Sequence, residues 1–245
     1  MFCDTHCHVL SEYYDDIDEI LKDAKEAGVS RVIDAAYNLE SSKEVMALVK
    51  KYPEIYGVVG LHPENIEEDF DYTIFDNLDK KIVGIGEIGL DYHYTKDNKD
   101  KQIEVFERQL DIAEKLNLPV VIHSREAAGD TLEILKRHHN FGVIHSYSGS
   151  LEMAREYIKL GFVLGINGVV TFKNCNLKDT LKNIDMNSIV LETDSPYLTP
   201  VPFRGTQNNP GKMMNTARFV ADIYGVSLSE LAEITNQNIK RIFDI

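Results

Sequence analysis

The stretch QIEVFERQLDIAEKLNLPVVIHSR (residues 102–125) joins a helical pattern directly to a strand pattern. Apolar residues recur through Gln102–Leu118 at the spacing of one helix face, with charged residues on the other face; they are Ile103, Phe106, Leu110 and Ala113. The following segment, Pro119–Arg125, is short and rich in β-branched residues, which is typical of a buried strand. The stretch therefore predicts a helix that leads into a buried strand, the repeating unit of a parallel sheet.

The same alternation runs along most of the chain. Eight short apolar runs predict strands: Phe2–Val9, Arg31–Ala36, Tyr56–His62, Ile82–Leu90, Pro119–Arg125, Phe141–Ser146, Phe162–Val169 and Ile189–Ser195. Further helical patterns cover Asp15–Gly28, Met213–Tyr224 and Leu228–Ile242. In the first of these, Gly28 suits the left-handed position that ends a helix.

Strands separated by helices must run parallel, because each crossover needs about a dozen residues or more. Eight such units predict an α/β fold of the TIM type, a single-domain (β/α)₈ barrel over residues 1–245; a doubly wound open sheet is the main competitor. The length of 245 residues fits, since such barrels typically need about 250. No linker or low-complexity segment divides the chain.

The composition narrows the class of protein. A formal net charge of −14 argues against broad electrostatic binding to nucleic acid or an anionic membrane. No apolar run approaches the roughly 20 residues of a membrane span, and no targeting segment is visible. Cys3 and Cys7 flank two histidines, but their spacing is not that of a zinc motif, and Cys175 is isolated, so apolar packing is favoured. A reducing cytoplasm is the expected location.

Polar residues fall at or near the predicted C-terminal ends of the strands. They are His6, His8, His62, Glu87, Asp91, His123, His145 and Asp194. In an α/β barrel these ends converge on one mouth, where active sites are built. Side chains far apart in the sequence are therefore expected to meet there.

Six of these residues are the expected ligands of one or two divalent cations. His6 and His8 are two residues apart in a strand, so both imidazoles point to the same face. Glu87 has two carboxylate oxygens and can bridge two cations, as two-metal hydrolases require. His123, His145 and Asp194 each follow an apolar run, where an unpartnered polar side chain would be costly. Zinc, magnesium and manganese all remain open.

The neighbouring polar residues have weaker claims. Asp4 and Glu192 each precede an expected ligand by two residues, and either they hold a histidine by its free ring nitrogen or they form a structural ion pair. Asp91 lies past its strand and is expected to fix the loop. His62 and His93 lie near the mouth, while the adjacent pair at 138–139 has the pattern of an exposed helix end.

Seven motifs together resemble the TatD family of metal-dependent deoxyribonucleases, in the amidohydrolase superfamily. They are DTHCH (4–8), GLHPE (60–64), GEIGLDYH (86–93), VIHSREA (121–127), IHSYSGS (144–150), LETDSPYL (191–198) and PVPFRG (200–205). The resemblance implies a barrel in which His6, His8 and Asp194 hold one metal, His123 and His145 the other, and Glu87 bridges. One departure is HSYSGS at 145–150, where the family usually reads HCFSGS; the histidine is retained.

The resemblance implies hydrolysis of DNA phosphodiester bonds. A metal-activated water would attack phosphorus, with Asp194 and Glu87 as the catalytic carboxylates. His62, Arg125 and Arg204 are the expected substrate-binding residues, although either arginine could equally form a surface ion pair. The acidic balance favours an exonuclease that grips few phosphates at a single-stranded end, with no stable protein partner and no membrane. The alternatives are a hydrolase of a small amide, ester or lactone and a non-catalytic binding barrel.

Overall fold

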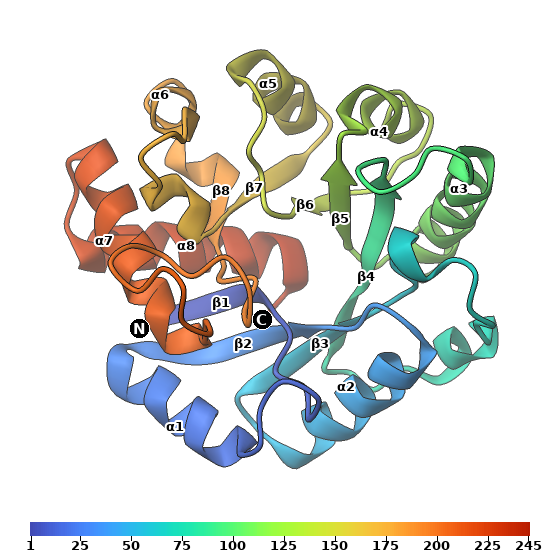
Figure 1. Cartoon of the computed structure of the whole chain (residues 1–245), viewed down its shortest axis with the longest axis horizontal. Coiled ribbons are helices and arrows are strands. Elements are labelled where there is room, and N and C mark those ends of the chain that lie inside the picture. The colour runs from blue at the N-terminus through green and yellow to red at the C-terminus, as the bar shows by residue number, and fades with distance from the viewer.

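The computed structural model describes residues 1–245, and its eight strands are hydrogen-bonded in sequence order. The strands are β1 (Phe2–Cys7), β2 (Val29–Ala35), β3 (Ile55–Val59), β4 (Ile82–Asp91), β5 (Val120–Arg125), β6 (Gly142–Ile144), β7 (Phe162–Ile166) and β8 (Ile189–Leu191). Every pair of neighbours from β1 to β8 is parallel. Figure 1 shows the strands at the centre and the helices around them.

The sheet closes on itself through the residues that follow β8. Asp194 donates its backbone N–H to the carbonyl of His6 at 2.9 Å, and His8 donates to the carbonyl of Ser195 at 2.8 Å. Cys7 and Ser195 form a parallel bridge. These contacts join the last strand to the first, so the predicted TIM-type barrel is confirmed and the open sheet is excluded.

The helices lie mainly in the crossovers between strands. They are α1 (Ile17–Ala27), α2 (Leu39–Lys51), α3 (Lys99–Leu116), α4 (Ala128–Leu135), α5 (Leu151–Lys159), α6 (Leu177–Leu181), α7 (Met213–Tyr224) and α8 (Leu228–Phe243), with short 3₁₀ turns η1 (Pro63–Asn65), η2 (Tyr72–Asn77), η3 (Gly168–Thr171), η4 (Met186–Ser188) and η5 (Pro210–Lys212). Gly28 ends α1 at a φ of 113°, as its position in the sequence predicts. No helix combines the length and apolar content needed to span a bilayer.

Several strands end earlier than the sequence predicts. The three largest differences are at Tyr56–His62, Phe162–Val169 and Ile189–Ser195, where the strands stop at Val59, Ile166 and Leu191. The backbone leaves the ladder at the mouth of the barrel to form loops. Asp194, for example, has a φ of 56°, a left-handed conformation that a regular strand cannot contain.

One layer of side chains fills the barrel below the mouth, with a contribution from every strand. It contains Cys3, Ile33, Val58, Val83, Val121, Val143, Val163 and Val190, and α8 closes it from below with Ile239, Ile242 and Phe243. Side chains two residues further along a strand point the same way. The residues two positions after Val121, Val143 and Val190 are His123, His145 and Glu192. Because side chains alternate between the two faces of a strand, these polar groups lie directly above the apolar layer.

Candidate metal centre

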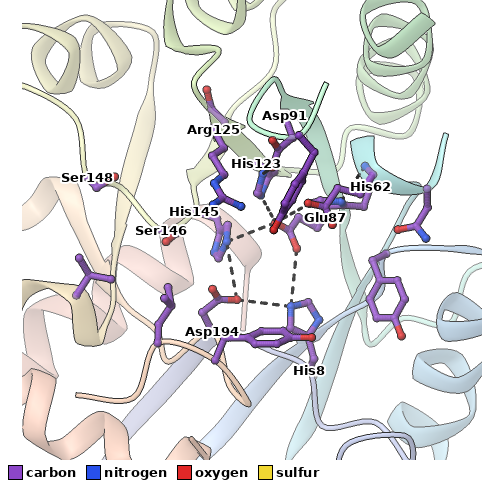
Figure 2. Close-up of a pocket in the computed structure, with 18 of the residues that line it drawn as sticks. His8, His62, Glu87, Asp91, His123, Arg125, His145, Ser146, Ser148 and Asp194 are labelled. Carbon is purple, nitrogen blue, oxygen red and sulfur yellow. Dashed lines mark hydrogen bonds and ion pairs between the residues drawn. The ribbon is translucent and has the colours of Figure 1, made fainter. Parts of the chain in front are cut away.

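A cavity of 720 Å³ opens above the apolar layer, and most of the expected ligands line it (Figure 2). They are His8, Glu87, His123, His145 and Asp194. His6 does not line the cavity and is fully buried. The structure thus brings all six expected ligands together from β1, β4, β5 and the segments that follow β1, β6 and β8.

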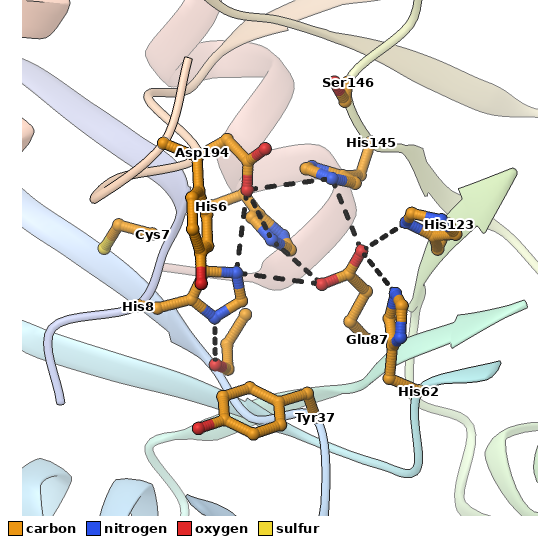
Figure 3. Close-up of polar contacts among 12 residues, drawn as sticks. His6, Cys7, His8, Tyr37, His62, Glu87, His123, His145, Ser146 and Asp194 are labelled. Carbon is orange, nitrogen blue, oxygen red and sulfur yellow. Dashed lines mark hydrogen bonds and ion pairs between the residues drawn. The ribbon is translucent and has the colours of Figure 1, made fainter. Parts of the chain in front are cut away.

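Glu87 lies at the centre of this group, and its two oxygens face different histidines (Figure 3). Oε2 lies 3.3 Å from Nε2 of His6 and 3.8 Å from Nε2 of His8. Oε1 lies 2.8 Å from Nδ1 of His123 and 3.4 Å from Nε2 of His145. A carboxylate placed in this way can offer one oxygen to each of two cations.

Asp194 completes the side of the centre that contains His6 and His8. Its Oδ1 lies 3.7 Å from Nε2 of His6, 3.6 Å from Nε2 of His8 and 3.9 Å from Nε2 of His145. The side chain of Asp194 is 14% exposed, whereas that of His6 is fully buried. Asp194 is therefore the carboxylate on this side that water and substrate can reach.

In three of the histidines, the ring nitrogen that faces away from Glu87 or Asp194 contacts an oxygen atom that orients the ring. Nδ1 of His8 lies 2.8 Å from the carbonyl oxygen of Ala35, which can only accept a hydrogen bond. Nδ1 of His145 lies 3.0 Å from Oε1 of Glu192, although the angle is poor for a hydrogen bond. Nε2 of His123 lies 2.9 Å from Oδ2 of Asp91. Such contacts favour a proton on the outer nitrogen, so that a bound cation would take the inner one.

The donor set fits divalent cations. Both ring nitrogens of His6 are buried and have no hydrogen-bond partner, although a buried polar atom normally has one. Ligand atoms lie within 4.8 Å of one another in three groups: His6–His8–Glu87, His6–His145–Asp194 and His62–Glu87–His123. Imidazole nitrogens mixed with carboxylate oxygens suit zinc and manganese better than an all-oxygen site would.

The charge states also suit cation binding. Burial opposes ionisation of Glu87, but the imidazoles around it, led by that of His145, hold its pKa well below the usual value. Burial likewise opposes ionisation of Asp194, but His145, His8 and His6 together outweigh it, so that this pKa is lowered too. Burial, aided by His145, lowers the pKa of His6. Ionised carboxylates and a neutral His6 are forms that bind metal. Burial opposes protonation of His123 and His145, but Asp91 and Glu192 outweigh it and, with Glu87, raise the pKa of His123 to about 9 and that of His145 to about 10, so a cation would replace a proton on each of these two rings.

Glu192 fits the first of its two alternatives, the support of a histidine, whereas Asp4 neither contacts an imidazole nor forms an ion pair. Glu192 contacts the ring of His145 and also accepts the backbone N–H of Ser146 at 2.7 Å, so it supports a histidine. Asp4 contacts no imidazole. It accepts hydrogen bonds from the backbone N–H and hydroxyl of Thr193 at 2.9 and 2.5 Å and thereby ties β1 to the segment after β8.

Asp91 and His62 both do more than the sequence predicts. Asp91 is the last residue of β4, so its expected place beyond the strand is wrong. It does fix the loop, since Oδ1 accepts the backbone N–H of His93 at 2.8 Å, and its other oxygen faces His123. His62 lines the cavity with Nε2 3.6 Å from Oε1 of Glu87, close enough to join a group of possible ligands.

Of the two arginines expected to bind substrate, only Arg125 lines the cavity. Arg125 lines the cavity, with its guanidinium 5.3 Å from the ring centroid of Tyr94. Arg204 does not line the cavity, because its guanidinium stacks 3.8 Å from the ring centroid of Phe172. Although Arg204 follows the last strand in the sequence, it is therefore not part of the cavity wall.

The remaining histidines lie elsewhere. His93 is paired with Glu126 at 2.7 Å and does not line the cavity. His138 and His139 follow α4 rather than end it, and His138 is half-buried against Glu114 at 3.3 Å, so the expected exposed helix end is wrong for that residue. Cys3 and Cys7 are buried packing residues outside the groups of possible ligands.

Sequence reasoning missed several residues of the cavity wall. Tyr13, Tyr37, Tyr94 and Tyr197 line it, together with Ser146 and Ser148. The signal for Ser146 was its place directly after His145, where the loop must face the mouth. The tyrosines lie on loops whose course depends on packing between distant segments, and no periodic pattern marks them.

Comparison with known proteins gives consistent matches over the whole chain. A model of the family described as TatD related DNase matches residues 3–244. The uncharacterized metal-dependent hydrolase YabD of Bacillus subtilis is 39% identical over 100% of both chains. The human deoxyribonuclease TATDN3 is 30% identical over 98% of this chain and 93% of that protein. The crystal structure of the TatD homologue YJJV from Escherichia coli K12 superposes with a TM-score of 0.94 at 30% identity, covering 100% of this chain and 98% of the other.

Proposed function

Because the chain belongs to the TatD-related DNase family of metal-dependent hydrolases, we propose that it removes nucleotides from the free ends of single-stranded DNA. The main support for a metal-dependent hydrolase is the position of Glu87, whose two oxygens face different histidines inside one cavity. His6, His8 and Asp194 would hold one cation with Glu87, and His123 and His145 would hold the second.

Divalent cations at these positions would polarise a phosphoryl oxygen and lower the pKa of a water molecule. The protein's own groups then direct the proton. Oδ1 of Asp194 faces the imidazoles, which leaves Oδ2 to accept a proton from the attacking water. As the bond from phosphorus to the leaving oxygen breaks, this proton passes to that oxygen, so the protein ends the reaction unchanged.

His62 would contact the phosphate as a hydrogen-bond donor. Its Nδ1 accepts the backbone N–H of Glu64 at 3.1 Å, so the proton of the neutral ring lies on Nε2, which points toward Glu87. Burial, with the neighbouring His123, lowers the pKa of His62 and keeps the ring neutral. A neutral N–H can donate to a phosphoryl oxygen but is a poor metal ligand at that same atom, which favours substrate binding over coordination for His62.

The charge on the cavity wall supports action at a strand end. Arg125 is the one lysine or arginine among the lining residues, whereas Glu64, Glu87, Asp91 and Asp194 contribute four carboxylates. Affinity for a long stretch of nucleic acid comes mainly from lysine and arginine on phosphates. A cavity with one such group grips few phosphates, and a closed apolar floor stops a strand from threading through the barrel.

The test compares three substrates with the purified protein after zinc, magnesium or manganese has been restored. A linear single strand should be shortened from an end, a linear duplex should react more slowly, and a closed circular duplex should stay intact. Rapid nicking of the circle would contradict the proposal. Inactivity on all three, with turnover of a small ester, amide or lactone, would replace it by a small-molecule hydrolase.

A further inference from the structure

Three tyrosines form one wall of the cavity beside His8; we call Tyr13, Tyr37 and Tyr197 the tyrosine wall. Their ring centroids lie 6.5, 5.9 and 6.3 Å from that of His8. They come from the segments after β1, β2 and β8, and all three line the cavity. Figure 3 shows Tyr37 next to His8. The site described above uses none of these rings.

Contacts among neighbouring groups hold the rings in place. The hydroxyls of Tyr13 and Tyr197 lie 3.1 Å apart, and their rings meet edge to face at 5.9 Å. Tyr37 donates its hydroxyl to the carboxylate of Glu12, and Gln207 donates to the carbonyl of Tyr13 at 2.7 Å. Tyr197 nevertheless remains 51% exposed. The wall is therefore an ordered aromatic surface with one largely accessible ring.

An accessible tyrosine at the edge of a nuclease cavity has a natural ligand in an unpaired nucleobase. Bases stack on aromatic side chains regardless of sequence, because every base has a π-face. Phenol hydroxyls can also donate to or accept from a sugar hydroxyl. Duplex bases are already stacked and paired, so only an unpaired end can use such a surface.

The charges divide the cavity into two sides. Arg125 lies on the side of His123, across the cavity from His8 (Figure 2). The tyrosine wall has no lysine or arginine, and the carboxylate of Glu12 contacts it through Tyr37. A phosphate is therefore favoured beside Arg125, whereas a neutral nucleoside is favoured beside the wall.

We propose that the tyrosine wall binds the base and sugar of the terminal nucleoside, and that it takes a nucleoside with a free terminal hydroxyl in preference to one with a terminal phosphate. This inference rests on the proposed action on single-stranded ends. Beyond that function, it specifies that the base and sugar are recognised and that the strand ends in a hydroxyl.

The first experiment compares single strands that end in a normal nucleotide or in an abasic residue, at either the 5′ or the 3′ end. Binding is measured by fluorescence anisotropy on the metal-loaded protein, with a phosphorothioate at the terminal linkage to slow hydrolysis. Cleavage is followed on the unmodified strands. At one of the two ends the normal nucleotide should bind about ten-fold tighter, which corresponds to about 1.4 kcal/mol of base stacking.

Tyr197→Ala should reduce this preference to about one. Tyr197→Phe keeps the ring and should retain most of the preference, which separates loss of stacking from misfolding. Phe203→Ala is the matched control, because Phe203 follows β8 in the same segment and is 42% exposed but does not line the cavity. The control should leave the preference unchanged.

The second experiment compares ends that carry a hydroxyl or a phosphate. The hydroxyl end should react several-fold faster, and Glu12→Gln should narrow that difference by removing the carboxylate beside the wall. Equal binding of normal and abasic ends, or a preference that survives Tyr197→Ala, would overturn the inference even if the strands are cleaved. A Tyr197-dependent binding preference without cleavage would support nucleoside binding by the tyrosine wall and reject the proposed function. If neither the preference nor cleavage were observed, both proposals would be rejected.

Discussion

Nδ1 of His145 lies 3.0 Å from Oε1 of Glu192, a carboxylate that is itself completely buried. The contact turns the other ring nitrogen toward Glu87, 3.4 Å away. Glycine at position 165 makes it possible, because a Cβ there would lie 2.1 Å from Oε2 of Glu192. The geometry of the candidate metal centre thus depends on a residue on β7 that carries no side chain.

Gly165→Ala should therefore displace Glu192 and, through it, His145. We expect metal affinity or activity to fall by about 10- to 100-fold, as for other groups that orient a ligand histidine. Glu192→Gln should have a loss of the same order. Gly129→Ala is the control, since a Cβ there meets nothing within 4 Å. Activity assays and metal titrations would detect the loss, and a fully active Gly165→Ala variant would contradict this role for Glu192.

Removal of His6 and His8 should remove metal. The protein should carry up to two divalent ions per chain, and the double variant His6→Ala, His8→Ala should lose about one of them. Elemental analysis by mass spectrometry measures the content. The control is the double variant His138→Ala, His139→Ala, which removes two histidines outside the cavity. Unchanged metal content in the first variant would refute the proposed centre.

Replacement of Glu87 by alanine should cost activity far more than it costs folding. A carboxylate that holds both cations would organise the whole proposed centre, and we expect activity to fall by at least about 100-fold, comparable to the loss of a strong electrostatic contact at the reacting centre. Chemical denaturation of the metal-free proteins measures their free energies of unfolding. If metal-free Glu87→Ala were markedly less stable than the metal-free parent, Glu87 would have a structural role instead. Glu126→Gln, on an exposed pair, is the control.

The salt dependence of DNA binding should be shallow. Each phosphate neutralised on a single strand contributes about −0.7 to the slope of log K against log salt, and we expect a total no steeper than about −3. Arg125→Gln should make the slope shallower by about 0.7, because Arg125 is the one arginine on the cavity wall. Arg137→Gln, on the surface, should leave it unchanged. A steeper slope would indicate a basic surface outside the cavity.

Stability should depend on pH through Asp34, which is buried beside the segment that follows His8. Burial raises the pKa of Asp34 from 3.8 to about 7, although the backbone N–H of Val9 partly opposes this shift. The folded state therefore binds the proton more tightly than the unfolded state, and stability falls as pH rises from about 4 to about 7.

Asp34→Asn keeps an oxygen for the N–H of Val9 and removes this titration. The stability of the variant relative to the parent should increase across that range by up to about 4 kcal/mol, since a tenfold change in proton affinity corresponds to about 1.4 kcal/mol. Urea denaturation at several pH values measures the difference. A difference that is independent of pH would show that Asp34 titrates normally.

The sequence by itself predicted the barrel and the six expected ligands. Both follow from local rules: a strand alternates its side chains with a period of two, so Val121 and His123 must point the same way, and the ends of parallel strands in a barrel share one mouth. A charged or imidazole group at such a position needs a partner. These constraints act within a few residues and are readable from one chain.

Only the tertiary structure decided how those groups are oriented and what surrounds them. The carbonyl of Ala35 selects the ring nitrogen that His8 presents, and the hydrogen bond from Glu64 makes His62 a donor. The course of the loops placed Tyr197 in the cavity wall and left Arg204 stacked on Phe172 outside it. Contacts of this kind join segments far apart in the chain, and loops have no repeating pattern, so packing alone determines them.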